Sequence, residues 1–461
     1  MASGDLPVLR RLVEGGQSTL IENFAGFGNG VFWPAFATGG SPADYGRYFW
    51  RQIRTGSYEI ERFDDETQIK QRPFWGALDD AGKKVAVIDA VRAPLAHIHH
   101  GIEVSDWFAH DRISVARSSP PDLIDKVIAE YGDDPFDGTA FDTNRSSAEC
   151  WALTDRLEER IGTKMRLLTR LLTEESWDLF MPVFGEPHDV GHHCWHLHDP
   201  QHPGFDAEMF EKRGDPILRI YKVLDEAMGR LIEAAGPDAR IFVVTGPGMQ
   251  PNDTANHLLD PILRRLEAGP KAATAAKVDR IGSLYELLLP KAVRRLLSPL
   301  AQISRRKVNQ AEYASRKFFV VPHNANAGAI RINLVGREPQ GKVHRGAEYD
   351  QICADLTRDL LEIRNADSGG PLVARVIRVD QVVSGPYLDD MPDLLVEWHR
   401  PGAIRAARSE KIGEVYVPSP FTRTGDHTPF GLFATSSPAK NLPEKLAPSE
   451  IAPLIKQAVL A

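Results

Sequence analysis

The sequence is poor in cysteine, with only Cys150, Cys194 and Cys353, which lie far apart and form no Cys-x-x-Cys pair. Neither a disulfide framework nor a thiolate zinc site is therefore indicated, and a reducing compartment is the default. The chain also has no run of 18 apolar residues, and its N-terminus MASGDLPVLRRLVEGG lacks the charged and apolar regions of a signal peptide. We therefore expect a soluble, cytoplasmic protein with no membrane span.

Positive charge is also scarce. The chain has 55 Lys and Arg against 63 Asp and Glu, a net charge of −8, whereas a dedicated nucleic-acid binder needs a basic surface to neutralise phosphates. Internal repeats and low-complexity linkers are absent from the sequence. One elaborated domain over residues 1–461 is therefore favoured, although a chain of this length could hold about three. The oligomeric state stays open.

Apolar, β-rich segments alternate with helical ones along the chain. Helices are predicted at 146–172 and 216–235, where apolar residues recur at i, i+3, i+4 and i+7. This alternation predicts a layered α/β fold, with a mixed, mostly parallel sheet flanked by helices. Strands are predicted at 83–90, 177–185, 240–246, 317–322, 329–334, 373–383 and 393–398.

A helical insertion is expected over residues 257–316. Within it, 279–307 has a helical period but is broken at Pro290 and Pro299. Its basic face is typical of the solvated side of a docked helix rather than of a membrane-binding surface. In layered α/β folds, ligands bind beyond the carboxyl ends of strands. The loops after Gly185 and Gly246 are therefore where a functional site is expected.

The segment GEPHDVGHHCWHLHDPQHPGFD, residues 185–206, is rich in histidine and directly follows a predicted strand. Asp189 and His193, four residues apart, are predicted to converge on one cation as the loop turns away from the strand. A carboxylate oxygen with an imidazole nitrogen suits Zn²⁺ or Mn²⁺. The other histidines are candidates for support of the ligands, for substrate binding or for ordinary loop hydrogen bonds; they include His192, His196, His198 and His202.

A third ligand has to come from elsewhere in the chain. The segment RTGDHTPFGLFATSS, residues 423–437, offers His427 in a glycine-punctuated turn before an apolar stretch. By itself, His427 is equally compatible with an ordinary loop histidine. Three such ligands would hold one divalent metal with an open fourth position.

Several ordered blocks together resemble one known family. The blocks are WDLFMPVFGEPHDVGHH, YKVLDEAMGRLI, RIFVVTGPGM, RINLVGREPQGKVHRGAEYD, GPYLDDMPDLLVEW and TGDHTPFGLF, preceded by FWPAFATGGSPADYGRYFW. Over about residues 6–437 the chain resembles the alkaline-phosphatase superfamily, in particular its type I phosphodiesterase and nucleotide pyrophosphatase branch. The resemblance implies an α/β sandwich with two metals at the strand ends. It also implies that Asp189, His193 and His427 hold the first metal.

The resemblance fails at the second metal. Where the family has Ser-Asp-His-Gly-Met, with Asp and His as ligands, this chain has Thr-Gly-Pro-Gly-Met, so Gly246 and Pro247 replace both. The family's Asp at the end of its first strand falls before Asp5, where no strand is expected, unless Asp5 itself replaces it. Counting back from the Thr-Gly pair places Asn29 at the family's nucleophile, and a carboxamide cannot form a phospho-enzyme.

Two functions remain open on this basis. The first is a metal-dependent hydrolase of phosphate diesters, or of related small phosphate or sulfate esters, that uses one divalent metal, zinc or manganese, and water instead of a covalent intermediate. The alternative is a catalytically silent relative that binds a phosphorylated or sulfated ligand, or a protein partner, in the same pocket. Metal analysis combined with turnover of an aryl phosphodiester separates them.

Overall fold

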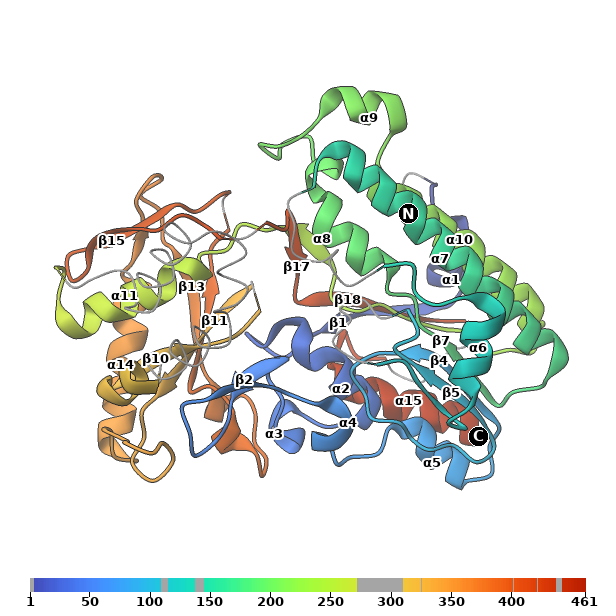
Figure 1. The fold of residues 1–461 in the computed structure, drawn as a ribbon, viewed down its shortest axis with the longest axis horizontal. Helices are drawn as coiled ribbons and strands as arrows, with labels where there is room; N and C mark the ends of the chain where they lie inside the picture. The colour runs from blue at the N-terminus through green and yellow to red at the C-terminus, as the bar shows by residue number, and fades with distance from the viewer. Residues whose placement is uncertain are drawn as a thin grey trace, which may run out of the picture.

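The computed structural model describes residues 4–108, 115–136, 145–271, 310–324, 326–400, 402–420, 422–436 and 442–461. Figure 1 shows helices and sheets arranged around a central region where segments from both halves of the sequence meet. All seven predicted strands and both predicted helices are present, so the mixed α/β class is confirmed. Of the helices described, none is long and apolar enough to cross a membrane.

Two four-stranded sheets form the right-hand half of the molecule in Figure 1. One has the order β19-β1-β18-β8 and the other β6-β5-β4-β7. The central strand β4 has the burial of a core strand, because all six of its residues are buried. The bounds are β1 Gln17–Glu22, β4 Val85–Ala90, β5 Gly101–Ser105, β6 Arg117–Ser119, β7 Leu179–Pro182, β8 Phe242–Val244, β18 Phe430–Thr435 and β19 Lys445–Leu446.

Strand β1 and the strand pairing correct two expectations. A strand does precede the Asn29 region, since β1 is long enough to pair with β18 over six residues. This strand was not predicted, because its sequence QSTLIE places polar residues on both faces of the strand and so lacks the alternation of polar and apolar residues. Parallel pairing is found for β4 with β5, β4 with β7 and β1 with β19. Antiparallel pairs outnumber these in the described chain, so the fold is mixed but not mostly parallel.

Helices cover both sides of this half. The helices α7, α8 and α10 pack against one another, and α2, α5 and α15 form a second group. α7 begins at a capping box in which Ser146 and Glu149 satisfy each other's backbone N–H groups. The bounds are α1 Pro7–Gly15, α2 Phe32–Thr38, α5 Phe74–Asp80, α6 Leu123–Tyr131, α7 Ser147–Glu174, α8 Glu186–His198, α9 Ala207–Arg213, α10 Pro216–Ala235 and α15 Pro448–Leu460.

The left-hand half in Figure 1 is built on an antiparallel sheet of order β10-β11-β14-β13. Helices α11 and α14 and a small sheet of order β12-β15-β16 share its core, which is distinct from the cores of the other half. The bounds are α11 Asn256–Ala268, β10 Phe318–Val321, β11 Ala327–Ile332, α14 Ala347–Leu361, β12 Arg364–Asn365, β13 Val373–Arg378, β14 Leu394–Trp398, β15 Ala406–Ser409 and β16 Gly413–Tyr416.

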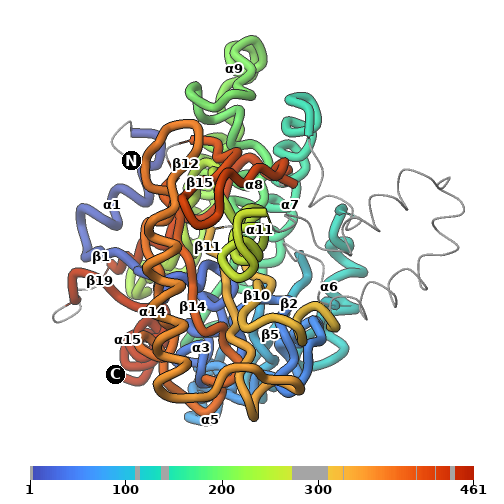
Figure 2. The backbone as a smooth tube through the Cα atoms, turned by 90° about the vertical axis from the view of Figure 1, so that its left-hand side faces the viewer, coloured from blue at the N-terminus to red at the C-terminus, as the bar shows by residue number. Residues whose placement is uncertain are grey.

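Short elements connect the two halves. Figure 2 looks from the left-hand side of Figure 1, so the half with β10, β11 and α14 stands in front. Ile53 of β2 shares a core cluster with Phe319 of β10 and Ala329 of β11. Strand β9 pairs with β17, and β17 contacts α8. The bounds are η1 Gly28–Val31, α3 Pro42–Tyr45, β2 Arg51–Ile53, β3 Ile60–Arg62, α4 Asp65–Gln68, β9 Met249–Pro251, η2 Val379–Gln381, η3 Leu388–Asp390 and β17 Gly425–His427.

The expected insertion is described only at its ends. Helix α11 opens it, and residues 310–316 close it. Residues 272–309, and with them the segment predicted at 279–307, lie outside the described residues. The single-domain organisation and the bounds 257–316 stay predictions.

Candidate metal centre

The histidine-rich segment forms a helix, not the expected loop. α8 begins at Glu186, four residues after Pro182, the last residue of β7. Pro187 occupies its first turn, where a proline is tolerated. The acidic side chains of the first turn suit the positive end of the helix dipole. Residues four apart share a face of a helix. His188 and His192 therefore share one face, and Asp189 and His193 the next.

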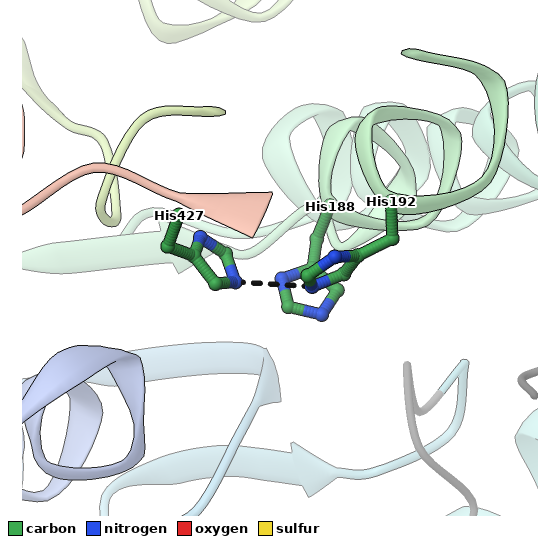
Figure 3. Close-up of side chains that lie close together, drawn as sticks. All are labelled: His188, His192 and His427. Carbon is green, nitrogen blue, oxygen red and sulfur yellow. Dashed lines mark hydrogen bonds between the residues drawn. The ribbon is translucent and has the colours of Figure 1, made fainter. Parts of the chain in front are cut away.

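His188 and His192 meet His427, which lies on β17 (Figure 3). One ligand atom from each of the three lies within 4.8 Å of the others. The two Nε2 atoms of His192 and His427 are 3.1 Å apart. His192 and His427 are buried, and His188 is half-buried. Among the described residues, these three form the one group of at least three His, Cys, Asp or Glu side chains close enough together to hold a metal ion.

Hydrogen bonds to carbonyl oxygens fix the tautomers of two of these rings. Nδ1 of His192 lies 2.8 Å from the Gly425 oxygen, and Nδ1 of His427 lies 3.3 Å from the Pro247 oxygen. A carbonyl oxygen only accepts, so each Nδ1 carries the proton and each Nε2 presents a lone pair. Burial lowers the pKa of both imidazoles, which keeps them uncharged near neutral pH.

Two Nε2 lone pairs therefore face each other at 3.1 Å. A cation between the two nitrogens would bind both, since each is an acceptor. Three neutral imidazoles are a common donor set for zinc, with a fourth position open to water or substrate. The residues present thus fit a single divalent metal.

Asn29 lies beside this group. Its Nδ2 is 2.8 Å from Nε2 of His427, so the amide and a metal would compete for the one lone pair of that nitrogen. The residue sits on the short helix η1, directly before α2. Counting along the sequence predicted Asn29 at the nucleophile position, and the structure brings it to the histidines. It offers an amide there, so the site has a hydrogen-bond donor where a hydroxyl nucleophile was expected.

Asp189 and His193 lie on the face of α8 nearer to α7. Oδ2 of Asp189 is 3.3 Å from Nη1 of Arg160, and both side chains are buried. Burial raises the pKa of this carboxyl, and the guanidinium opposes the rise. The backbone oxygen of His193 accepts from Cys150 of α7, and burial lowers the pKa of its imidazole to about 3. Both residues stay predicted ligands, and the geometry adds a competing pair, His188 and His192.

The two predicted supporting histidines have different surroundings. His192 is part of the three-histidine group, whereas Nδ1 of His196 lies 3.2 Å from Oγ1 of Thr424, one turn further along α8. His188 was not predicted from the sequence. It lies four residues before His192, but this spacing indicates a shared face only if the segment is a helix, which begins at Glu186.

A tryptophan borders the predicted second metal position. Gly246 and Pro247 lie between β8 and β9. A Cβ atom on Gly246 would lie 3.4 Å from Cζ2 of Trp33, in van der Waals contact with the indole, so the indole borders any side chain placed here. Pro247 contributes only its carbonyl oxygen, to His427. Neither residue supplies a side-chain ligand.

The residues around the first strand supply no replacement carboxylate at this position. Asn23 follows β1 and is buried, with its Nδ2 donating to the Gly28 oxygen. Asp5, considered as a substitute ligand, pairs instead with Lys222 of α10 at 2.6 Å. That expectation is therefore corrected.

Comparisons with known proteins identify the family. The sequence matches the family described as type I phosphodiesterase / nucleotide pyrophosphatase over residues 1–415. No curated protein matches it. Phosphonoacetate hydrolase from Sinorhizobium meliloti 1021, in complex with phosphonoformate, is similar with a TM-score of 0.55 at 16% identity, covering 100% of this chain and 91% of that chain. Human ectonucleotide pyrophosphatase / phosphodiesterase 5 gives a TM-score of 0.46 at 11% identity, covering 99% and 90%.

Proposed function

Because the chain belongs to the type I phosphodiesterase and nucleotide pyrophosphatase family, we propose that it is a phosphoester hydrolase that works with one metal held by His188, His192 and His427. The family consists of phosphoester hydrolases of the alkaline-phosphatase superfamily, so the predicted fold and enzyme class are confirmed. The observation that carries the one-metal proposal is the convergence of two Nε2 lone pairs whose tautomers are fixed by backbone carbonyls.

Zinc is the metal best suited to three imidazoles, with manganese as the second choice. A bound divalent metal supplies Lewis-acid polarisation of a phosphoryl oxygen. The carbonyl oxygens of Gly425 and Pro247 orient two of the imidazoles toward it. Burial, and after it the positive charge of Arg423, lowers the pKa of His192 and of His193. A positive charge in this region would favour an anionic substrate.

Asn29 orients the substrate in this proposal. Its amide donates at the position where a hydroxyl would otherwise attack, so it can hold a phosphoryl oxygen but cannot form a bond to phosphorus. The attacking group is therefore water, and no phospho-enzyme forms. The missing second metal withdraws transition-state stabilisation, and each 1.36 kcal/mol lost slows the reaction about tenfold. We expect a slow enzyme.

The alternative is a silent relative that binds a phosphorylated or sulfated ligand without turnover. Two observations favour it, the amide of Asn29 beside His427 and the indole of Trp33 against Gly246. The amide replaces the nucleophile of a two-metal hydrolase and the indole borders its second metal position, while the three histidines that could hold one metal remain. Binding and turnover therefore have to be measured separately.

The test uses the full chain loaded with zinc and four substrates: an aryl phosphodiester, an aryl phosphomonoester, an aryl sulfate and phosphonoacetate. The last is included because the phosphonoacetate hydrolase was solved with phosphonoformate bound. Turnover well below the median enzyme rate of about 10 per second, lost on chelation and in His192→Ala, is expected. Trapping of a phosphorylated protein, or turnover unaffected by chelation, would contradict the proposal. Phosphate binding without turnover of any ester favours the silent relative.

A further inference from the structure

Two of the three cysteines, which lie far apart in the sequence, meet between α7 and α8 (Figure 1). The side chain of Cys194 makes a hydrogen bond with that of Cys150, and its Sγ lies 3.7 Å from the backbone oxygen of Cys150. Both are free thiols, buried in the core that α7 and α8 share. Cys353 belongs to the core of the other half. Cys150 and Cys194 therefore form a thiol pair, and Cys353 stands apart from it.

His196 of α8 presents a lone pair to the thiol of Cys150. The hydroxyl of Thr424 donates to the backbone oxygen of His193 at 3.3 Å, so its oxygen is left to accept from Nδ1 of His196 at 3.2 Å. The proton of this imidazole therefore lies on Nδ1, and Nε2 faces Sγ of Cys150 at 3.9 Å as an acceptor. An imidazole that takes up the thiol proton leaves a thiolate, which is the reactive form of cysteine.

Cys150 is buried but lies near an exposed helix end. It is the fourth residue of α7, and Ala148 and Glu149 just before it are exposed. Helix ends open at little cost in free energy, so an oxidant about the size of water can reach this thiol. The start of a helix also favours a thiolate. The hydrogen bond with Cys194, and the contact with His196, lower the pKa of Cys150, although burial opposes them. Cys150 is thus the thiol that reacts first.

The thiol pair is joined to the three-histidine group through α8. Cys194 follows His192 by two residues on that helix, and the backbone oxygen of His193 between them accepts from Cys150 of α7. On another face, α8 contacts β17, which carries His427. A disulfide holds two sulfurs closer than a thiol hydrogen bond does, so its formation would draw α8 towards α7 and away from β17. Metal ligands have to keep their places within about 0.5 Å.

From this geometry we infer that Cys150 and Cys194 are an oxidation site: hydrogen peroxide converts them to a disulfide, which weakens metal binding by His188, His192 and His427. A transient disulfide of this kind is compatible with a reducing compartment. The disulfide itself does not depend on the proposed function, whereas its effect on the metal rests on it.

The oxidation takes two steps, with hydrogen peroxide as the electron acceptor. The Cys150 thiolate attacks one peroxide oxygen and the O–O bond breaks. The hydroxide that leaves takes up the proton that Cys150 gave to His196, which yields a sulfenic acid and water. Sγ of Cys194 then attacks Sγ of Cys150; the S–S bond forms, the S–O bond breaks, and the departing hydroxide leaves as water with the Cys194 proton. Two electrons pass from the two thiols to the peroxide, and a dithiol reductant reverses the change.

The test uses the full chain, reduced and free of metal, and treats it with a small excess of hydrogen peroxide. Peptide mass spectrometry is expected to find Cys150 joined to Cys194 and Cys353 still reduced. Zinc affinity, titrated against a competing chelator, is expected to fall about tenfold on oxidation, the loss that a displaced support of a metal ligand causes. Treatment with dithiothreitol is expected to restore it.

Three serine variants isolate the pair. Cys150→Ser and Cys194→Ser remove the disulfide, so their zinc affinity is expected to be the same before and after peroxide. Cys353→Ser is the matched control and is expected to behave like the wild type in both measurements. In the reduced state all three are expected to bind zinc as tightly as the wild type. Weaker binding by reduced Cys150→Ser and Cys194→Ser would mean that the thiols themselves hold zinc, which contradicts the inference.

The outcomes separate this inference from the proposed function. Two free thiols after peroxide treatment, or a sulfinic acid on Cys150 without a cross-link, would overturn the oxidation site. A disulfide that leaves the zinc affinity unchanged would overturn its effect on the metal, and the proposed function would stand. If the reduced protein binds no zinc, the proposed function fails, and the inferred effect on the metal fails with it. These wild-type comparisons need no variant, so a folding defect in a serine variant leaves them intact.

Discussion

The two metal positions expected for this family have opposite fates in one structure. At the first, α8 and β17 bring His188, His192 and His427 together, and backbone carbonyls orient two of the rings. At the second, Gly246 and Pro247 offer no side-chain ligand, and Trp33 packs against Gly246. In our proposal, the first position holds a metal through His188, His192 and His427, and the second has no side-chain ligand and is bordered by the indole of Trp33.

The proposal links the second position to Asn29, whose Nδ2 lies 2.8 Å from Nε2 of His427. A two-metal site uses one of its ions to activate the nucleophile. Without ligands for the second ion, a hydroxyl in place of the Asn29 amide would have no activator.

The largest effect is expected from removal of a histidine of the first position. His192→Ala and His427→Ala each remove one of three donors, and we expect zinc affinity to fall at least about a hundredfold. The matched control is His198→Ala on the same helix, where the ring pairs with Asp215. Zinc titration with a competing chelator measures the change. Equal losses in all three variants would mean that helix unfolding, not ligation, causes the effect.

Asp189→Asn separates the two candidate ligand pairs on α8. The carboxylate pairs with the buried Arg160, so we expect this variant to lose about 3 kcal/mol of unfolding free energy. Zinc content should nevertheless stay at the wild-type level, and His193→Ala should keep it as well. Urea unfolding and elemental analysis give the two readings. Loss of zinc in both variants would restore Asp189 and His193 as the ligands and displace His188 and His192.

Rebuilding the second position tests the role of Trp33. Gly246→Asp with Pro247→His restores the family's ligand types, but the new Asp side chain meets the indole, so we expect a loss of about 1–3 kcal/mol in stability. The zinc count should stay unchanged until Trp33→Ala makes room. If the double variant takes up an additional zinc with Trp33 in place, the indole does not close the second position.

Asn29 is expected to show the smallest effect on turnover. Asn29→Ala removes an orienting donor and no nucleophile, so most of the residual rate should remain. Asn29→Thr supplies a hydroxyl without a second metal to activate it, and intact-mass measurement during turnover should find no phosphorylated protein. A trapped phosphothreonine would show that the second position is not needed for activation.

The ordered blocks of the sequence identified the family, which the family match confirms. Counting from the Thr-Gly pair and the turn before the last apolar stretch also proposed Asn29 and His427, and the structure brings these two residues together. Motif spacing can give this much because it is a local property of the chain. The departures at Gly246 and Pro247 were likewise visible as missing side chains.

Other parts depend on three-dimensional packing. His188 was missed because a loop was expected where Pro187 starts a helix, and the helical phase decides which of two adjacent residues faces β17. The role of Trp33 depends on how α2 packs against the segment after β8, which no spacing in the sequence indicates.

Anomalous diffraction at the zinc edge, from crystals of the zinc-loaded protein, would locate the metal and its ligands. We expect one zinc peak per chain, bonded to Nε2 of both His192 and His427 and to a ring nitrogen of His188, at the distances of about 2.0–2.1 Å typical of zinc and imidazole. A peak bonded to Asp189 or His193, or a second peak beside Gly246 and Trp33, would contradict it.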